Sequence, residues 1–557
     1  MRMMKKLCVV MLLSGLALAQ SNAPSSSPSN SNVSDDLKQL REAIAQQQKQ
    51  ITDQQKLLTQ QQQQLETLQS ALEAKTTAHV ENAALTTTAP GVAPAQADTQ
   101  KAKESPLSFR IGGADFTPGG FVDFETVFRT TNTGGGITTP FGAIPFNNTI
   151  QGHLTEVRLT GQYSRANLKI STNYGENKIT GYVEGDFNGN DAANVFVSSN
   201  PHTARLRLYW MDLKRGKWEF LGGQTWGMQT PNRVGLSPNP AEVFATLGED
   251  AQTHVGLPYT RAAEFRAIYH VNDNFQWGVA LQNADQFVGA GEVIFPFAFN
   301  AALGPQFDAA NQTTVPNAFP DLHTKFAWDK DVDGKHMHFE GGGIVTTAKI
   351  TNVPIGGTTF AHHTAIGATG HAAFNFEVAK GFRVLANGMW GTGNGRYLIG
   401  LGPQAVAVPI ATSPGQFDLD VSMIHSGAMI VGSEIQHGKS LFGFYYGGMY
   451  FQRNAFEDTT SPVAATLGLP CNGGLTPVLH KPCIGFGGIN SPNSANRAIQ
   501  EGTIDWTQTM WKNPQHGAVL LVTQTSYVTR SPWFVAAGAP KNAHLVMGYV
   551  SLKYVLP

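Results

Sequence analysis

The sequence carries little charge. Only 14% of its 557 residues are Asp, Glu, Lys or Arg, whereas ordinary soluble domains contain roughly 25%. It also lacks a basic excess, because 39 Lys and Arg residues face 40 Asp and Glu residues. A dedicated nucleic-acid-binding protein normally has such an excess. We therefore expect no nucleic-acid partner, and a surface of which a large part avoids water.

Long apolar runs are missing as well. No run reaches the roughly 18 to 20 residues that a membrane-spanning helix needs. In lipid, the backbone polar groups are satisfied only in helices and in closed barrels. Low charge without spanning helices therefore leaves two interpretations, a large soluble all-β protein or a β-barrel in a membrane.

Cysteine is scarce, and its distribution indicates secretion. Residues 1–19 combine basic residues, a short apolar core and a small-x-small cleavage site, which predicts a secretory signal peptide. Its removal takes Cys8 and leaves Cys471 and Cys483, close together in a Gly- and Pro-rich stretch. In an oxidising compartment this pair is expected to form a local disulfide that staples a loop. Neither cysteine has the neighbours of a metal site or a nucleophile, which favours a structural role for the pair. For the chain as a whole we expect no metal and no cofactor.

Three segments precede the main domain. Residues 20–34 are rich in Ser, Asn and Pro and are expected to be disordered. Residues 35–75 repeat an apolar seam every seven residues, which predicts an α-helical coiled coil, and residues 76–106 are expected to form a flexible linker. A lone amphipathic helix is the alternative, but a Gln-rich surface leaves it nothing to pack on. The coiled coil implies self-association, and its oligomer number stays open. Its seam consists of Leu37, Leu40, Ile44, Ile51, Leu58, Leu65, Leu68 and Leu72.

From 107 to 557 the sequence alternates apolar and polar residues, as strands with one apolar face do. We predict about sixteen antiparallel strands, including single strands at 153–172 and 418–435. Short and long connections alternate throughout the domain. An outer-membrane barrel has this organisation, with short periplasmic turns, long extracellular loops and an even number of strands. The sequence therefore predicts an all-β transmembrane barrel in the outer membrane, with the coiled coil in the periplasm.

A barrel of this size leaves a water-filled channel, so passive passage of small hydrophilic solutes is the expected function. Charges on the lumen face would set the selectivity, but acidic and basic candidates are balanced in number. For each candidate, a salt bridge within the wall is an alternative to a contact with a solute. The basic pore-lining candidates are Arg158, Lys169, Arg205, Arg207, Arg266 and Arg383.

The third long connection, at about 227–260, is the candidate for a constriction inside the pore. The alternative is a loop that only covers the outer surface. Its charged residues are Arg233, Glu242, Glu249 and Asp250.

Two further patterns concern aromatic and acidic residues. Several Trp and Tyr residues near predicted strand ends, including Trp218, Trp226, Tyr163 and Tyr549, are expected to form interfacial girdles. Residues 329–340 match the spacing of a calcium loop, but the flanks alternate like strands, so we favour a polar Asp-Gly turn.

Several stretches are similar to one known family. The stretches 164–169 and 181–187, the Arg-Leu-Arg-Leu-Tyr-Trp strand at 205–210 and Gly-Gly-Gln-Thr-Trp at 222–226 resemble the DcaP-like outer-membrane porins of Gram-negative bacteria. The resemblance implies a homotrimer with a periplasmic coiled coil, and uptake of small anions such as dicarboxylates through a pore lined with arginines. By this analogy Arg205 and Arg207 become the best pore candidates.

The expected partners are further copies of the chain, outer-membrane lipid, small anionic or neutral solutes and, through the coiled coil, the cell wall. We expect no enzyme activity. One alternative is an envelope tether in which the barrel is only an anchor. Another is a soluble secreted β protein.

Overall fold

The computed structural model describes residues 105–189, 202–238, 254–289, 292–308 and 315–557. The predicted signal peptide and coiled-coil seam lie outside the described residues, together with nearly all of the linker. Glu242, Glu249 and Asp250 lie outside them too. Among the helices that are described, none is long and apolar enough to cross a membrane.

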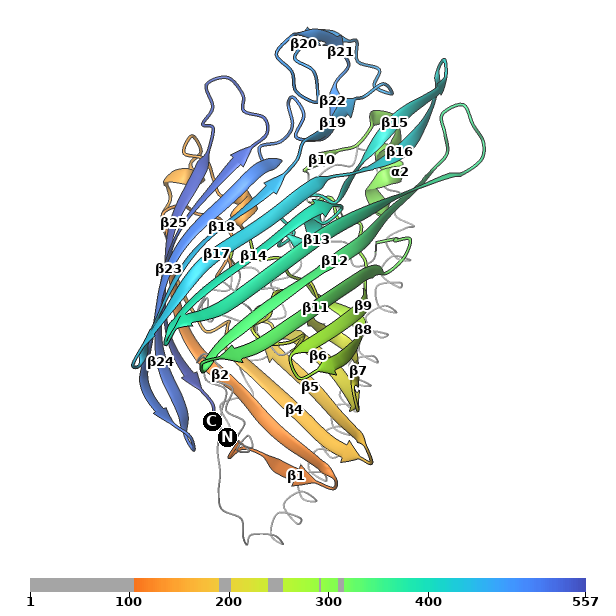
Figure 1. Ribbon diagram of the computed structural model, residues 1–557. Helices are drawn as coiled ribbons and strands as arrows, with labels where there is room; N and C mark the ends of the chain where they lie inside the picture. The colour runs from red at the N-terminus through yellow and green to blue at the C-terminus, as the bar shows by residue number, and fades with distance from the viewer. Residues whose placement is uncertain (1–104, 190–201, 239–253, 290–291, 309–314) are drawn as a thin grey trace, which may run out of the picture. The chain divides into compact units, whose positions relative to one another are not determined.

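One large antiparallel sheet dominates the structure, and its strands are among the coloured arrows of Figure 1. Its strands are β1 (Phe109–Ile111), β2 (Ala114–Arg129), β3 (Glu156–Thr160), β4 (Arg165–Tyr174), β5 (Asn177–Asp186), β6 (Arg205–Arg215), β7 (Trp218–Trp226), β8 (Arg261–Asn272), β9 (Phe275–Gln282), β11 (Asp321–Val332), β12 (Lys335–Asn352), β13 (Ala361–Ala379), β14 (Phe382–Thr392), β17 (His425–His437), β18 (Ser440–Phe451), β23 (Asn496–Asn513), β24 (Gly517–Pro532) and β25 (Ala543–Val555).

The sheet closes on itself, because β2 pairs with the last strand, β25, as well as with β3 and β4. These eighteen segments make sixteen wall strands. The reason is that β3 and β4 are successive parts of one strand beside β2, while β1 pairs only with β2 in the described part of the chain. The prediction of a sixteen-stranded antiparallel barrel is therefore confirmed. Closure leaves no free sheet edge along the wall.

Two predicted strands are wrong in detail. The strand expected at 153–172 is interrupted at 161–164, between β3 and β4. The strand expected at 418–435 is two elements, since 416–423 forms a hairpin with 405–413 and only 425–437 belongs to the wall. The break falls at Ile424, which is fully buried and whose backbone bonds to Gln404 and Gly393. Alternation continues across this residue, so a period-two pattern alone does not show the break.

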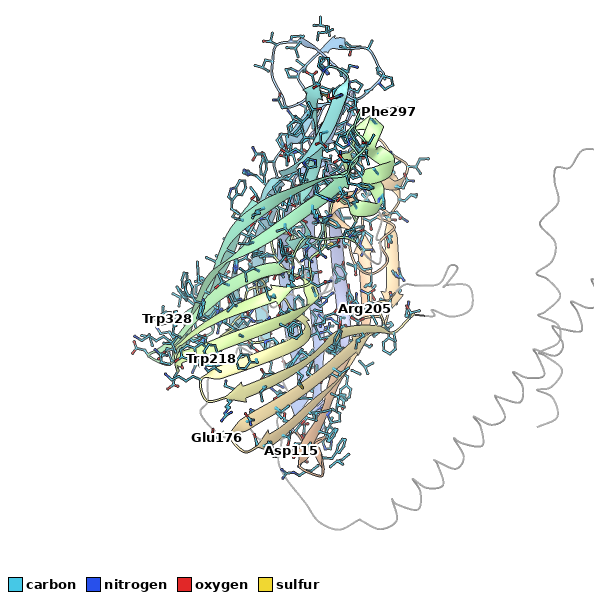
Figure 2. The ribbon with its side chains drawn as sticks, turned by 90° about the vertical axis from the view of Figure 1, so that its right-hand side faces the viewer. Asp115, Glu176, Arg205, Trp218, Phe297 and Trp328 are labelled. Atoms are coloured by element: carbon cyan, nitrogen blue, oxygen red, sulfur yellow. A yellow bond between two sulfur atoms is a disulfide. The ribbon has the colours of Figure 1, made fainter. Side chains whose placement is uncertain are left out.

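The short turns lie at one end of the barrel, and Figure 1 shows the described elements of the long connections, such as β15 and β16 (405–413 and 416–423) and β19–β22 (within 454–486), at the other end, at the top. The turn between β11 and β12 consists of Asp333 and Gly334, with φ of 52° and 73°. This is the two-residue geometry that Asp-Gly favours in hairpins. In Figure 2, Trp218 and Trp328 lie toward the turn end, Phe297 lies at the loop end and Arg205 lies between them.

The long connections contain the remaining elements. In the connection after β2 they are η1 (Phe141–Ala143) and η2 (Gln151–His153). In the connection after β9 they are β10 (Val293–Ile294), η5 (Phe297–Phe299), α2 (Asn300–Leu303) and η6 (Gly304–Gln306). In the connection after β14 they are η7 (Gly395–Tyr397), β15 (Ala405–Ser413) and β16 (Gln416–Met423). In the connection after β18 they are β19 (Asn454–Glu457), β20 (Thr466–Gly468), β21 (Val478–His480) and β22 (Cys483–Phe486).

The two faces of the wall have opposite character. On β2 the side chains of Val122 and Phe124 are 62% and 57% exposed, whereas Asp123 and Glu125 are buried. A water-soluble protein normally hides its large apolar side chains and exposes its carboxylates. The reversed pattern is that of a barrel wall with lipid outside and a polar interior.

The prediction of aromatic girdles is only partly right. Trp218 and Trp277 are exposed on the outer face. Tyr163, Trp226 and Tyr549 are buried, with exposures of 5%, 2% and 1%. These three side chains lie among residues inside the barrel, where inward-folded connections cover them.

Candidate functional site: the barrel lumen

The two described ends of the third long connection, residues 227–238 and 254–260 between β7 and β8, lie inside the barrel. Arg233 donates hydrogen bonds of 3.0 and 2.5 Å to the two carboxylate oxygens of Glu434 on β17. Val255 donates its backbone N–H to Glu501 on β23, at 2.9 Å. Because β17 and β23 are not sheet neighbours of β7 or β8, both described ends of this connection reach across the lumen. The loop therefore does not merely cover the outer surface.

Charged side chains of the barrel wall fix the position of residues 230–232, the part of this connection that follows β7. Lys325 on β11 donates to the backbone oxygen of Thr230 and to the side-chain oxygen of Asn232, both at 2.9 Å. Lys325 also pairs with Glu340 on β12 at 3.0 Å. Glu340 in turn accepts a hydrogen bond from the Asn232 backbone N–H at 3.2 Å. An unpaired charge at such a buried site would be costly, so these contacts hold the segment against the wall.

The first long connection also folds inward, which the alternation of the flanking strands does not predict. Ile137, Phe141 and Ile144 are buried in a cluster with wall residues such as Leu545 and Met547. Arg530 on β24 donates to the backbone oxygen of Ile144 at 2.7 Å. The sequence does contain an indication of this burial, because these apolar side chains stand in a connection that is otherwise rich in Gly, Thr and Asn. The loop end of the lumen therefore holds an apolar core.

Arginines from three wall strands gather on one side of the lumen. Arg205 on β6 donates to both oxygens of Asp186 on β5, at 2.9 and 2.6 Å. Arg207 on β6 pairs with Glu184 and lies 3.7 Å from Asp186. Arg165 on β4 lies 3.7 Å from Glu184. The carboxylates of Glu184 and Asp186 are therefore shared among three guanidinium groups.

A shift in the pairing of β5 with β6 shapes this cluster. Glu184 pairs with Leu208 but Gly185 pairs with Leu206, so Arg207 is the extra residue of a bulge. As a result Arg207 and Leu208 are both buried inside, while Leu206 is 56% exposed. Strict alternation along 205–210 predicts Leu206 and Leu208 on the same face, and the bulge makes that prediction wrong.

A fourth arginine joins the cluster at the start of β8. The guanidinium of Arg261 lies 5.1 Å from the ring centre of Trp226 and 5.4 Å from that of Tyr259. Arg207 lies 5.2 Å from the same Trp226 ring. Within the described ranges Arg261 forms no ion pair, and Arg165, Arg205 and Arg207 repel it. We name Arg165, Arg205, Arg207 and Arg261 the arginine cluster; its four positive charges face the two carboxylates of Glu184 and Asp186.

The other predicted pore residues lie apart from these pairings. Arg266 is buried, pairs with Glu264 at 2.5 Å and donates to the backbone oxygen of Leu236 at 2.9 Å, so it supports the third connection. Arg383 donates to Asn375 at 2.5 Å and is buried. Arg158 is half-buried and bonds to Gln162 at 3.2 Å, and Lys169 is exposed on β4.

A small stapled subdomain stands at the loop end. Cys471 and Cys483 form a disulfide with a Cα–Cα distance of 5.4 Å. Together with His480 they bring two sulfur atoms and one nitrogen within 4.8 Å of one another. Because the two sulfurs are bonded to each other, they are not free as metal ligands.

Comparison with known proteins supports the fold. No family model and no curated protein matches the sequence. Among solved structures, the barrel is similar to the outer membrane channel DcaP of Acinetobacter baumannii, with 15% identity and a TM-score of 0.51 over 80% of this chain and 98% of that chain. OmpT of Vibrio cholerae has 10% identity and a TM-score of 0.40 over 80% of this chain and 99% of that chain. OmpF of Salmonella typhi, in complex with daunomycin, has 10% identity and a TM-score of 0.37 over 81% of this chain and 100% of that chain.

The expected resemblance to DcaP-like channels is thus confirmed for the fold. The DcaP comparison has a TM-score above one half, and its low identity establishes the fold and nothing finer.

Proposed function

We propose that the protein is an outer-membrane porin that lets small hydrophilic solutes diffuse passively and favours small anions. The fold supports the channel role, because a closed sixteen-stranded barrel with an apolar outer face and a polar inner face suits an aqueous pore. The DcaP protein is described as an outer membrane channel, and we carry that role to this chain as part of the proposal.

The observation behind the anion preference is the arginine cluster. Its four guanidinium groups outnumber the two nearby carboxylates, and in the part of the chain that is described Arg261 lies over the rings of Trp226 and Tyr259 and forms no ion pair. Rings of Arg or Lys in a pore favour anions, since the field of the uncompensated charge raises the local anion concentration. A small carboxylate would fit the planar donors of a guanidinium group.

Ion selectivity tests the proposal most directly. In planar bilayers with asymmetric KCl, the reversal potential should indicate anion preference. Arg261→Gln should shift it toward cations, because this variant removes the arginine without stranding a paired carboxylate. The control is Arg215→Gln, because the Arg215 side chain is exposed at the turn end and pairs with the exposed Glu176 at 3.6 Å. Absence of channels would refute the porin role, and an unchanged reversal potential in Arg261→Gln would refute the role of the cluster.

The assembly belongs to the same proposal. We propose that residues 1–19 are a signal peptide removed on export, that residues 35–75 form a periplasmic coiled coil, and that three copies assemble through it. The heptad seam supports self-association. Deletion of residues 35–75 should leave the barrel folded and reduce the mass of the detergent-solubilised complex from three chains to fewer. An unchanged mass would show that the coiled coil does not hold the copies together.

A further inference from the structure

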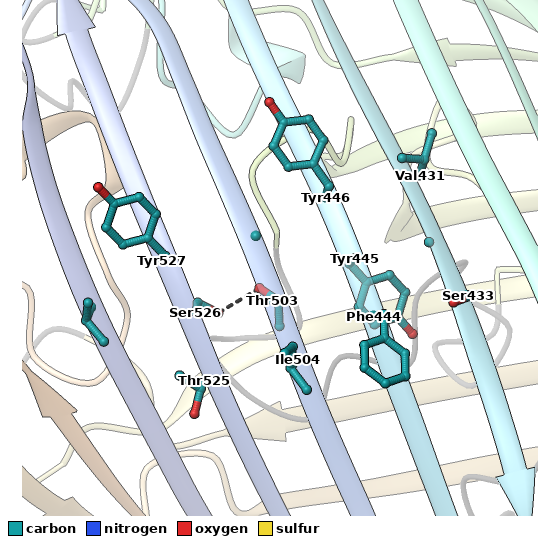
Figure 3. A pocket seen from close by; sticks show the side chains of 13 residues that line it. Val431, Ser433, Phe444, Tyr445, Tyr446, Thr503, Ile504, Thr525, Ser526 and Tyr527 are labelled. Atoms are coloured by element: carbon teal, nitrogen blue, oxygen red, sulfur yellow. Dashed lines mark hydrogen bonds between the residues drawn. The ribbon is translucent and has the colours of Figure 1, made fainter.

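The outer face of the wall contains a groove of about 700 Å³, formed by β17, β18, β23, β24 and β25. Figure 3 shows the side chains that line it. They include Val431, Phe444, Tyr446, Ile504, Tyr527 and Val546, and none of the lining side chains carries a charge. The groove lies on the same face as the exposed apolar residues of these strands, so it would face lipid in the proposed orientation.

A glycine between two tyrosines creates the groove. Gly502 on β23 pairs directly with Tyr446 on β18 and with Tyr527 on β24. No atom lies within 4 Å of the position that a Cβ would occupy on Gly502, and its φ is not in the left-handed region. The backbone therefore does not require glycine here. Its effect is to leave a floor without a side chain between two aromatic walls.

The polar atoms at the groove indicate what occupies it. The side chains of Tyr446 and Tyr527 are 47% and 52% exposed, and neither hydroxyl has a hydrogen-bond partner in the described portion of the chain. In Figure 3 both hydroxyls point along the strands in the same direction, toward the loop end. In apolar surroundings a phenolic hydroxyl without a partner is costly. The occupant therefore needs an apolar body in the groove and a hydrogen-bond acceptor at the loop side.

We propose that the groove binds one acyl chain of a membrane lipid from the leaflet at the loop end, and that the Tyr446 or Tyr527 hydroxyl donates a hydrogen bond to its acyl carbonyl. This inference rests on the proposed function only in placing the barrel in a membrane. A second copy of the chain is the alternative occupant, and the experiment below distinguishes it from a lipid. The groove volume lies within the roughly 300–1,000 Å³ of ordinary ligand sites.

Lipid retention measured by native mass spectrometry tests this site. The full-length protein is reconstituted with a palmitoyl-oleoyl phosphatidylethanolamine, solubilised in mild detergent and activated stepwise. The wild type should keep one lipid per barrel after all others are lost. Gly502→Leu fills the open space and should lose that lipid. Tyr446→Phe combined with Tyr527→Phe keeps the shape but removes both donors, and retention should fall roughly two- to tenfold.

The matched control is Gly388→Leu on β14. Gly388 also has an exposed outer face with nothing within 4 Å of its Cβ position, and it is not part of the groove. It should retain lipid like the wild type. Circular dichroism and heat-dependent gel mobility confirm that each variant is folded.

The proposal is overturned if the wild type keeps no lipid, or if Gly502→Leu keeps a lipid as well as the wild type does. It is also overturned if Gly502→Leu changes the number of associated chains while lipid retention stays the same. The last result would assign the groove to a second copy. Bilayer recordings on the same samples separate the two proposals. Normal channels without a retained lipid refute only the lipid site, and a retained lipid without channels refutes only the porin role.

Discussion

The contact between Arg233 and Glu434 should control how firmly the third long connection is held in the lumen. Glu434 is 4% exposed and also accepts a hydrogen bond of 2.6 Å from the Tyr445 hydroxyl. Burial disfavours the charge on Arg233, yet the Glu434 carboxylate outweighs it and holds the pKa of the guanidinium above its ordinary value. Arg233 therefore stays charged across the accessible pH range.

Arg233→Ala should release this segment. The variant removes the cation that donates two hydrogen bonds to the buried Glu434 carboxylate, and removing one partner of such a pair costs about 3–5 kcal/mol. We take about 3 kcal/mol, because the Arg233 side chain is 11% exposed and water can partly replace it. At 1.4 kcal/mol for each factor of ten, the open population of the segment should rise about 100-fold.

Thiol labelling measures that population. A cysteine in place of Leu236, which is 2% exposed, reacts with a soluble maleimide only when the segment opens. The two cysteines of the disulfide remain unreactive. The labelling rate should rise about 100-fold in Arg233→Ala, and single-channel traces should become noisier.

Glu434→Gln combined with Arg233→Ala provides the control. Removing both charges is far less costly than stranding one, so the labelling rate should return to within about tenfold of the parent. A single variant that labels no faster than the parent would refute the reasoning. A double variant as fast as the single one would show that the contact acts through packing and not through charge.

Three further outcomes are expected. Replacing Cys471 and Cys483 by Ser should cost the stapled loop about 3 kcal/mol, seen as faster trypsin cleavage of that loop with an unchanged barrel. Burial raises the pKa of Glu292 in the β9–β11 connection to about 8. Since the folded state then binds the proton more tightly than the unfolded state, the stability of this connection should fall as pH rises from about 4.5 to about 8. Hydrogen exchange measures this dependence, and Glu292→Gln should abolish it. Gly120 has φ of 135°, and a Cβ there would lie 2.1 Å from a backbone oxygen of β4. Gly120→Ala should therefore lower the folded yield severalfold, whereas Gly113→Ala should leave it unchanged. Equal yields would contradict the steric argument.

Part of the fold and the site could be predicted from the sequence because the signals are local. The alternation on β2 and β25, and the Asp-Gly turn after β11, depend only on residues close together in the chain. Arg205 and Arg207 were identified in the same way, as two basic residues on one strand. Arg165 lies in a stretch that resembles the DcaP-like family, but no pattern marked it as a partner of the other two.

Arg261 shows what the sequence did not reveal. It is the first residue of β8, directly after the long third connection, and no periodicity distinguishes it. Its place beside Trp226 depends on the register of β7 against β8. The bulge at Arg207 is similar, because it is defined by which residues of β5 stand opposite.

The sequence by itself determined the number of wall strands, the side of the barrel on which the long connections lie and the apolar character of its outer face. Each follows from alternation and turn chemistry along the chain. Only the tertiary structure decided that the first connection and the described ends of the third fold into the lumen, that four arginines meet two carboxylates, and that Gly502 opens a groove between two tyrosines. These features depend on contacts between residues far apart in sequence, and closure of the barrel is what brings those residues together.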